Sequence, residues 1–175
     1  MINNTDPNPT IIIRQASVAD AAELQTLRLE ALQNRPEAFG GDYDREKQEA
    51  VSDWEKRLSE QTDHAIFVAV AKGNLVAMTS IGFPDRPKLK HNGTIWGVYV
   101  QPQWRGRGIS NQLIDACADW AKSHSIKLLR LAVASTNLSA INSYARSGFR
   151  VYGIDPQVIY YDGVYYDELL MIRNV

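Results

Sequence analysis

One short segment places two arginines among glycines just before a predicted helix. It reads Arg105-Gly106-Arg107-Gly108-Ile109-Ser110 and follows an apolar stretch that ends at Gln101-Pro102. Glycines permit positive φ and close approach of the backbone, and the first turn of a helix presents unpaired N–H groups at the positive end of its dipole. With the arginine charge added, these features predict a site for a phosphate or pyrophosphate. The alternative is a plain strand-to-helix turn with two surface arginines.

The spacing of this loop does not match two common nucleotide motifs. No Gly-Lys-Ser/Thr follows the glycines, so the loop is not a Walker A motif. It also does not read Gly-x-Gly-x-x-Gly, so a dinucleotide site of the Rossmann type is not indicated.

A second segment, from Asn137 to Phe149, carries polar and aromatic residues at helical spacing. Ala140 and Tyr144 are four residues apart and share one face of the predicted helix. A small residue beside an aromatic one leaves room for a thin ligand against that face. The alternative roles are structural: Asn137 stands where a helix cap belongs, and an aromatic residue on a helix commonly packs in the core.

Together the two segments resemble the GNAT superfamily of N-acetyltransferases. The family's cofactor motif, Arg/Gln-x-x-Gly-x-Gly/Ala, is similar to residues 105–110, with Ser110 in place of the final Gly or Ala. The second family motif, Asn-x-x-Ala-x-x-x-Tyr-x-x-x-Gly-Phe, is matched from Asn137 to Phe149. The pattern Val98-x-Val100 before Pro102 also matches, and the similarity is sharpest over 94–153.

The resemblance implies acetyl-CoA as cosubstrate and direct transfer of its acetyl group to an amine in a ternary complex. It implies that the 105–110 loop binds the pyrophosphate, that the strand edge at 98–100 binds the pantetheine arm, and that Tyr144 donates a proton to the leaving sulfur. Tyr144 is thus the candidate catalytic residue. The candidate cofactor-binding residues are Val98, Tyr99, Val100, Arg105, Gly106, Arg107, Gly108, Ile109, Ser110, Asn137, Ala140 and Tyr144.

The resemblance does not assign the general base that an alkylamine acceptor needs. Thr94 and Ala132 occupy positions where relatives carry Glu. The histidines show no metal-ligand spacing, and no metal is expected. The substitutes open to the chain are a water chain or the side chains of Glu30, His91, Asp167 and Glu168.

The acceptor is expected to be an amine of a small molecule or peptide. Two other readings stay open: acetylation of protein N-termini or lysines, and a catalytically inactive acyl-CoA-binding sensor. By resemblance, the acceptor-binding segments are 28–60 and 155–168, and a homodimer is possible. An enclosed acceptor pocket, with core packing as the alternative role, is suggested by Trp54, Trp96, Tyr165 and Tyr166.

The pattern of apolar residues predicts a mixed α/β fold. The order of elements implies a twisted sheet of about seven strands with about four helices on its two faces, and the resemblance implies that the sheet splays between its fourth and fifth strands. Strands are predicted at 11–13, 65–71, 75–83, 94–100, 127–134, 149–161 and 164–172. Helices are predicted at about 17–33, 44–60 (with a possible break near Ser52), 109–122 and 138–147.

Composition sets the frame for these predictions. The 175 residues are 45% hydrophobic and 22% charged, an ordinary globular mixture that is expected to form a flexible tail, 1–10, and one acetyltransferase domain, 11–175. The net charge of −1 argues against a nucleic-acid partner. No apolar run approaches the ~20 residues of a membrane span, and the start lacks the regions of a signal peptide. With one cysteine, Cys117, the chain is expected to be cytoplasmic.

Overall fold

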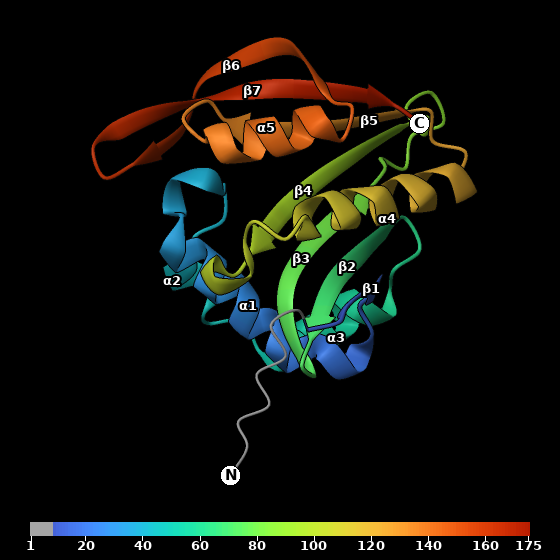
Figure 1. Cartoon of the computed structure of the whole chain (residues 1–175), viewed down its shortest axis with the longest axis vertical. Coiled ribbons are helices and arrows are strands. Elements are labelled where there is room, and N and C mark those ends of the chain that lie inside the picture. The colour runs from blue at the N-terminus through green and yellow to red at the C-terminus, as the bar shows by residue number, and fades with distance from the viewer. Residues whose placement is uncertain (1–8) are drawn as a thin grey trace.

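A seven-stranded sheet of order β1-β2-β3-β4-β5-β7-β6 organises the chain in the computed structural model, which describes residues 9–175 (Figure 1). All neighbouring strands are antiparallel except β4 and β5, which run parallel. The strands are β1 Ile11–Gln15, β2 His64–Ala71, β3 Asn74–Gly82, β4 Asn92–Val100, β5 Leu128–Ala134, β6 Arg150–Tyr161 and β7 Val164–Asn174. The predicted fold class is confirmed, whereas most of the predicted tail, residues 1–8, lies outside the described residues.

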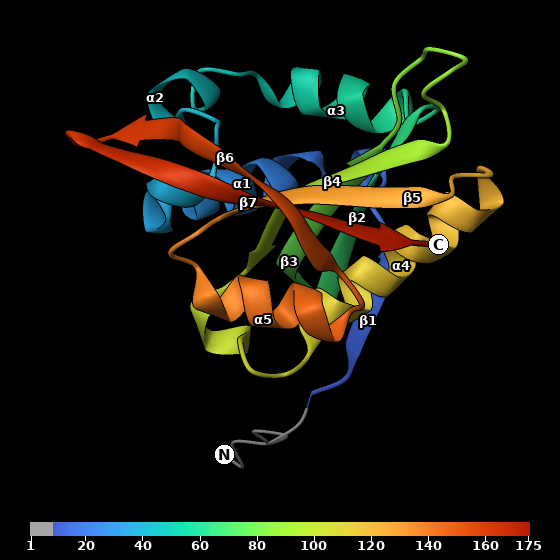
Figure 2. The same cartoon turned by 90° about the horizontal axis from the view of Figure 1, so that it is seen from above.

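Helices cover both faces of this sheet. They are α1 Ala21–Asn34, α2 Tyr43–Glu46, α3 Val51–Ser59, α4 Ile109–Ser123 and α5 Leu138–Arg146, with short 3₁₀ turns at Val18–Asp20, Pro36–Ala38 and Pro102–Trp104. Figure 2 shows α2 and α3 on one side of the sheet, and α4 and α5 on the other. No helix within residues 9–175 is long and apolar enough to cross a membrane.

The helix expected over 44–60 is in fact two helices, and the break lies before Ser52. Ala50 has an extended backbone, with φ −75° and ψ 154°. Its N–H donates to Asp53 Oδ2 at 3.0 Å, and its carbonyl accepts from the Asp53 N–H at 3.0 Å. This reciprocal pair satisfies backbone groups at a helix start, so α3 begins at Val51 as a separate helix.

Two apolar cores lie on the two faces of the sheet. The first lies between the sheet and α4, where Leu113, Ile114 and Cys117 have no exposed surface. The second lies against α1 and α3, where Leu24 and Leu27 pack with Trp54 and other side chains. Burying each such Leu or Ile contributes on the order of 1.5–3 kcal/mol, so both helical layers are held firmly to the sheet.

The sheet opens between β4 and β5, as expected. The two strands pair only from Asn92↔Leu128 to Thr94↔Arg130 and then diverge (Figure 1). The pairing of β4 with β3 also shifts in register, and Gly97 has φ +67° at that point. Such a bulge bends a strand and increases its twist, which directs the end of β4 away from β5.

Candidate active site

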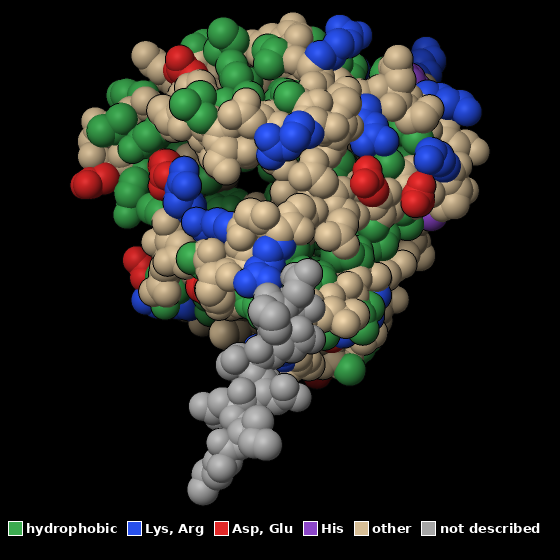
Figure 3. All heavy atoms as spheres, in the orientation of Figure 1, with side chains coloured by type: hydrophobic (Ala, Val, Ile, Leu, Met, Phe, Trp, Pro, Cys, Tyr) green, Lys and Arg blue, Asp and Glu red, His purple; other side chains and the backbone are tan. Residues whose placement is uncertain are grey.

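A cavity of about 830 Å³ occupies the gap where β4 and β5 diverge. Its lining comes from both faces of the sheet: α4 and α5 on one side, and the segment from α1 to Gly41 on the other. Figure 3 shows the molecule hollowed on the face in view, with Lys and Arg side chains beside the hollow. Every predicted cofactor-binding residue except Arg107 lines it: Val98, Tyr99, Val100, Arg105, Gly106, Gly108, Ile109, Ser110, Asn137, Ala140 and Tyr144.

The glycine loop leaves backbone exposed at the start of α4. Gly106 has φ +76° and Gly108 has φ +73°, conformations that favour glycine. Around each of them, no atom of residues 9–175 lies within 4 Å of the position that a Cβ would take. The first N–H groups of α4, at 109–111, lack acceptors within the helix. A negatively charged group can therefore approach these N–H groups without steric hindrance.

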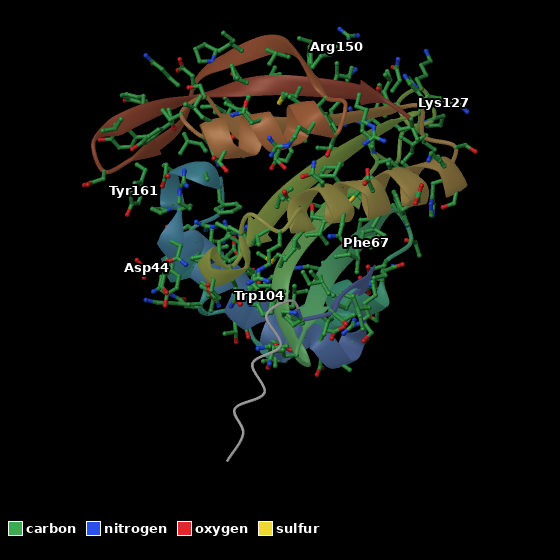
Figure 4. All side chains as sticks on the ribbon, in the orientation of Figure 1. Asp44, Phe67, Trp104, Lys127, Arg150 and Tyr161 are labelled. Carbon is green, nitrogen blue, oxygen red and sulfur yellow. The ribbon has the colours of Figure 1, made fainter. Side chains whose placement is uncertain are left out.

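The two arginines of this loop have different surroundings. Arg105 lines the cavity; its Nε donates to the Val100 carbonyl at 3.0 Å, and its guanidinium lies 5.9 Å from the centre of the Tyr99 ring. The Arg107 guanidinium instead lies over the Trp104 ring at 5.3 Å, outside the cavity lining. Trp104 is labelled in Figure 4, in the loop before α4.

Ser110, which departs from the family motif, joins α4 to α5. Its hydroxyl lies 2.8 Å from that of Ser143. The neighbouring Asn111 donates to the Ser143 carbonyl at 3.0 Å and to the Ser147 hydroxyl at 2.7 Å. At the other end of α5, Asn137 Oδ1 accepts from the Ala140 N–H at 3.2 Å as a helix cap. These contacts fix α5 across the cavity from the glycine loop.

Tyr144 lies on the face of α5 that borders the cavity. Its side chain packs edge-on against Phe149, with the ring centres 6.4 Å apart, and only 7% of its surface is exposed. Its hydroxyl has no hydrogen-bond partner among residues 9–175. Burial raises the pKa of the Tyr144 phenol, so this group is protonated at neutral pH and can donate a proton.

Glu168 is the one proposed substitute base that lines the cavity. It lies on β7 between Ala134 of β5 and Asp155 of β6. Burial, together with the charge of Asp155, raises the pKa of the Glu168 carboxyl. Thr94 and Ala132, where relatives carry Glu, also line the cavity.

The other candidates for the base make contacts elsewhere. Glu30 accepts hydrogen bonds from Tyr99 and Gln101. Asp167 Oδ1 accepts from the Gln157 N–H at 2.8 Å, and His91 Nε2 lies 3.0 Å from Asn92 Nδ2. None of these three side chains lines the cavity. No group of three or more potential metal ligands is found within residues 9–175.

The predicted aromatic lining is only partly correct. Trp96, 47% exposed, does line the cavity. Trp54 is buried in the core under α1 and α3, while Tyr165 is 60% exposed and packs against Tyr160. Tyr166 is also outside the lining. Phe39, within the segment 28–60 but not singled out by its residue type, also lines the cavity. It directly precedes Gly40-Gly41, the local signal that the chain turns there.

An ion pair anchors the cavity wall between α1 and α2. Arg28 donates from Nε and Nη2 to the two carboxylate oxygens of Glu46, each at 2.8 Å, and its guanidinium lies 5.3 Å from the centre of the Phe39 ring. A Cβ on Gly41 would overlap the contacting ends of both charged side chains. Glycine at 41 therefore lets the loop lie directly on this pair.

Comparisons with known proteins agree with this arrangement. The model of the acetyltransferase (GNAT) family matches residues 27–149. The chain is 27% identical over 124 residues to an L-amino acid N-acetyltransferase, AaaT, of Escherichia coli, covering 69% of this chain and 74% of that one. It is 27% identical over 165 residues to an L-methionine sulfoximine/L-methionine sulfone acetyltransferase of Pseudomonas aeruginosa, covering 93% and 94%.

The fold also matches a solved structure with a bound ligand. This is yncA, a putative acetyltransferase from Salmonella typhimurium, in complex with acetyl-CoA. It superposes with a TM-score of 0.78 at 22% identity, covering 94% of each chain. At 22% identity, this similarity supports the fold alone.

Proposed function

Because the chain belongs to the GNAT family of acetyltransferases, whose members use acetyl-CoA, we propose that it acetylates the amine of a small molecule in a ternary complex. The observation that carries the proposal is the cavity between β4 and β5. It reaches both faces of the sheet and borders the glycine loop, Tyr144 and Glu168. Donor and acceptor can therefore enter from opposite faces and meet in the gap.

The residues present fit acetyl-CoA. The unobstructed backbone at Gly106 and Gly108, with the N–H groups of 109–111 and the charge of Arg105, suits a pyrophosphate. Beyond Thr94, the edge of β4 has no partner strand on the β5 side, so its backbone can pair with the amides of a pantetheine arm. Ala140 on α5 also lines the cavity, and its small side chain leaves space for this arm. Bound there, acetyl-CoA supplies an acetyl group activated as a thioester.

In the proposed reaction Glu168 removes a proton from the acceptor ammonium. The freed amine then forms the C–N bond, and backbone N–H groups at 98–100 stabilise the negative charge that develops on the carbonyl oxygen. As the C–S bond breaks, Tyr144 gives its proton to the sulfur. As the amide forms, the nitrogen gives up its second proton to solvent. The products are an amide, a thiol and one proton, and the proton held by Glu168 restores Tyr144 through solvent.

We propose amino acids and close analogues as acceptors. The relatives named above act on L-amino acids and on L-methionine sulfoximine or sulfone. The acceptor side of the cavity carries Glu168 together with Arg28 and Arg35, whose ion pairs with Glu46 and Glu37 engage only some of their N–H groups. The remaining N–H groups and the Glu168 carboxylate suit a small zwitterion. A free-thiol assay with acetyl-CoA should show acceptor-dependent release with amino acids, compared against polyamines, aminoglycosides and peptides. Turnover of peptides alone would contradict this proposal, and binding of acetyl-CoA without any turnover would favour a sensor.

Gly41→Ala is expected to raise the KM for the acceptor about threefold to tenfold, by displacing the Arg28–Glu46 pair from the cavity wall. The KM for acetyl-CoA should not change, because the glycine loop lies across the cavity. Steady-state kinetics with each substrate varied in turn separates the two effects. Gly40→Ala is the matched control, since nothing lies within 4 Å of a Cβ at that position. Equal changes in both KM values would contradict the assignment of this wall to the acceptor.

We further propose that the protein forms a homodimer through the β6–β7 hairpin. Arg150 and Tyr161, labelled in Figure 4, mark the two ends of β6. This strand is one edge of the sheet. Large exposed apolar patches of this kind commonly mark interfaces. The exposed apolar side chains of the hairpin are Val151, Tyr152, Ile154, Val158, Tyr160, Tyr161, Val164 and Tyr165.

Light scattering after size exclusion should give twice the chain mass of 19.7 kDa. Ile154→Lys combined with Tyr160→Glu is expected to weaken the dimer at least about tenfold. Ile12→Lys, at the exposed β1 edge of the same sheet, should not. A wild-type protein that stays monomeric at about 100 μM would contradict the proposal.

We also propose that the protein is cytoplasmic. Its single cysteine, Cys117, cannot form a disulfide within the chain.

A further inference from the structure

A group of hydrogen-bonded side chains links α1 to the end of β4. The Tyr99 hydroxyl donates to Glu30 Oε1 at 2.9 Å and accepts from Asn34 Nδ2 at 2.8 Å. The second carboxylate oxygen, Glu30 Oε2, accepts from Gln101 Nε2 at 2.7 Å. Both oxygens of Glu30 are therefore engaged, and the phenol is fixed from two sides.

The position of Tyr99 in the core does not by itself require this polar group. Its side chain is 3% exposed and packs with Leu24, Leu27 and other apolar residues of the second core. Phenylalanine would fill the same space. A buried hydroxyl and a carboxylate must both be satisfied or they cost stability. The network therefore calls for an explanation other than packing.

The Tyr99 ring also lies near an arginine of the glycine loop. The Arg105 guanidinium lies 5.9 Å from its centre, and Arg105 Nε donates to the Val100 carbonyl at 3.0 Å. The remaining N–H groups of Arg105 have no hydrogen-bond partner within residues 9–175. Arg105 also lines the cavity. Its side chain is held through Nε and its guanidinium lies near the Tyr99 ring, while its other donors are left for a ligand.

The carboxylate strengthens this hold in two ways. It fixes the orientation of the Tyr99 ring, near which the Arg105 guanidinium lies. A phenol that donates a hydrogen bond to a carboxylate also has a more electron-rich ring, and the attraction of a cation to a ring face depends on that charge. Glu30 thus acts on Arg105 through Tyr99, without lining the cavity itself.

We infer that Glu30 is a positioning residue for anion binding, which sets the conformation of Arg105 through Tyr99. The inference rests on the proposed function, in which Arg105 meets the pyrophosphate of coenzyme A. Glu30 then serves the binding of the anion rather than the removal of a proton.

Glu30→Gln tests this inference because it keeps the size of the side chain but replaces the charged carboxylate, to which the Tyr99 hydroxyl donates, by a neutral amide. Calorimetry should show the Kd for coenzyme A rising about threefold to tenfold. The Kd for pantetheine, which has no pyrophosphate, should stay within twofold. In turnover, the KM for acetyl-CoA should rise with kcat unchanged. Tyr99→Phe keeps the ring but loses the hydroxyl, and it serves as the second variant if Glu30→Gln does not fold.

Two further variants distinguish positioning from a general loss of structure. Gln101→Met removes the other branch of the network and should leave the Kd for coenzyme A within twofold. In an Arg105→Gln background, Glu30→Gln should change that Kd by less than twofold, because the two residues act as one unit. Additive effects, or equal weakening of coenzyme A and pantetheine, would overturn the inference. If the wild type does not distinguish coenzyme A from pantetheine at all, the proposed pyrophosphate site is itself wrong.

Discussion

Tyr144→Phe is expected to lower kcat about tenfold to thousandfold while the Kd for coenzyme A stays nearly unchanged. The phenol of Tyr144 borders the cavity, has no hydrogen-bond partner within residues 9–175 and has a raised pKa. It is therefore a protonated donor at neutral pH. Without it, the sulfur must leave as a thiolate or take its proton from water. The aromatic ring and its contact with Phe149 remain, so the fold should not change.

The measurement is single-turnover kinetics together with calorimetry of coenzyme A binding. Tyr152→Phe is the matched control, because that ring lies under Arg130 and outside the cavity. An unchanged kcat in Tyr144→Phe would remove the hydroxyl from the mechanism. A large loss of coenzyme A affinity would instead assign the hydroxyl to binding.

Glu168→Gln is expected to lower kcat/KM about a hundredfold to a thousandfold at neutral pH. The variant keeps the size of the side chain but cannot accept the proton of the acceptor ammonium. Asp167→Asn is the matched control, since this neighbouring carboxylate bonds the Gln157 N–H and does not line the cavity. It should retain most of the wild-type rate.

The pH dependence gives an independent check on Glu168. A base works only when deprotonated, and burial raises the pKa of the Glu168 carboxyl above the ordinary range of a glutamate. The rising limb of kcat/KM in the wild type should therefore lie at a higher pH than an ordinary glutamate would give. In Glu168→Gln this limb should disappear, and the remaining pH dependence should follow the ionisation of the acceptor amine. The difference in kcat/KM between variant and wild type should shrink at high pH, because the amine is then already deprotonated. An unchanged profile would contradict the role of Glu168 as base.

The parts of the site that were predictable from sequence are those encoded by adjacent residues. The glycine loop at 105–110 and the spacing from Asn137 to Tyr144 are local, because a helix start and a helix face are each defined within a few residues. The cavity brings these segments together. The strand edge at 98–100 also lines the cavity, and its position was predictable because it directly precedes the loop.

Features that depend on distant pairing were not predictable in this way. Nothing near Glu30 in the sequence indicates that its carboxylate meets Tyr99, 69 residues further along the chain. Asp167 and Glu168 are neighbouring carboxylates on opposite faces of β7. Which of the two faces the cavity depends on how β7 pairs with its neighbours. The helical spacing around Trp54 is the same whether this helix packs against the core or against the cavity. The sequence therefore does not indicate which of the two the Trp54 side chain contacts. The β-bulge at Gly97 depends on how β4 pairs with β3, and the residues next to Gly97 in the sequence do not indicate that pairing.

The short pairing of β4 with β5 also has a mechanical consequence. Across that junction, three consecutive residue pairs, from Asn92↔Leu128 to Thr94↔Arg130, join the strands of the two halves of the sheet. The side chains around the cavity also join the two halves, because Ser110 and Asn111 at the start of α4 contact Ser143 of α5. A ligand bound where β4 and β5 diverge would contact residues of both halves. Because any ligand that binds only the folded state stabilises it, binding there should raise the free energy of unfolding.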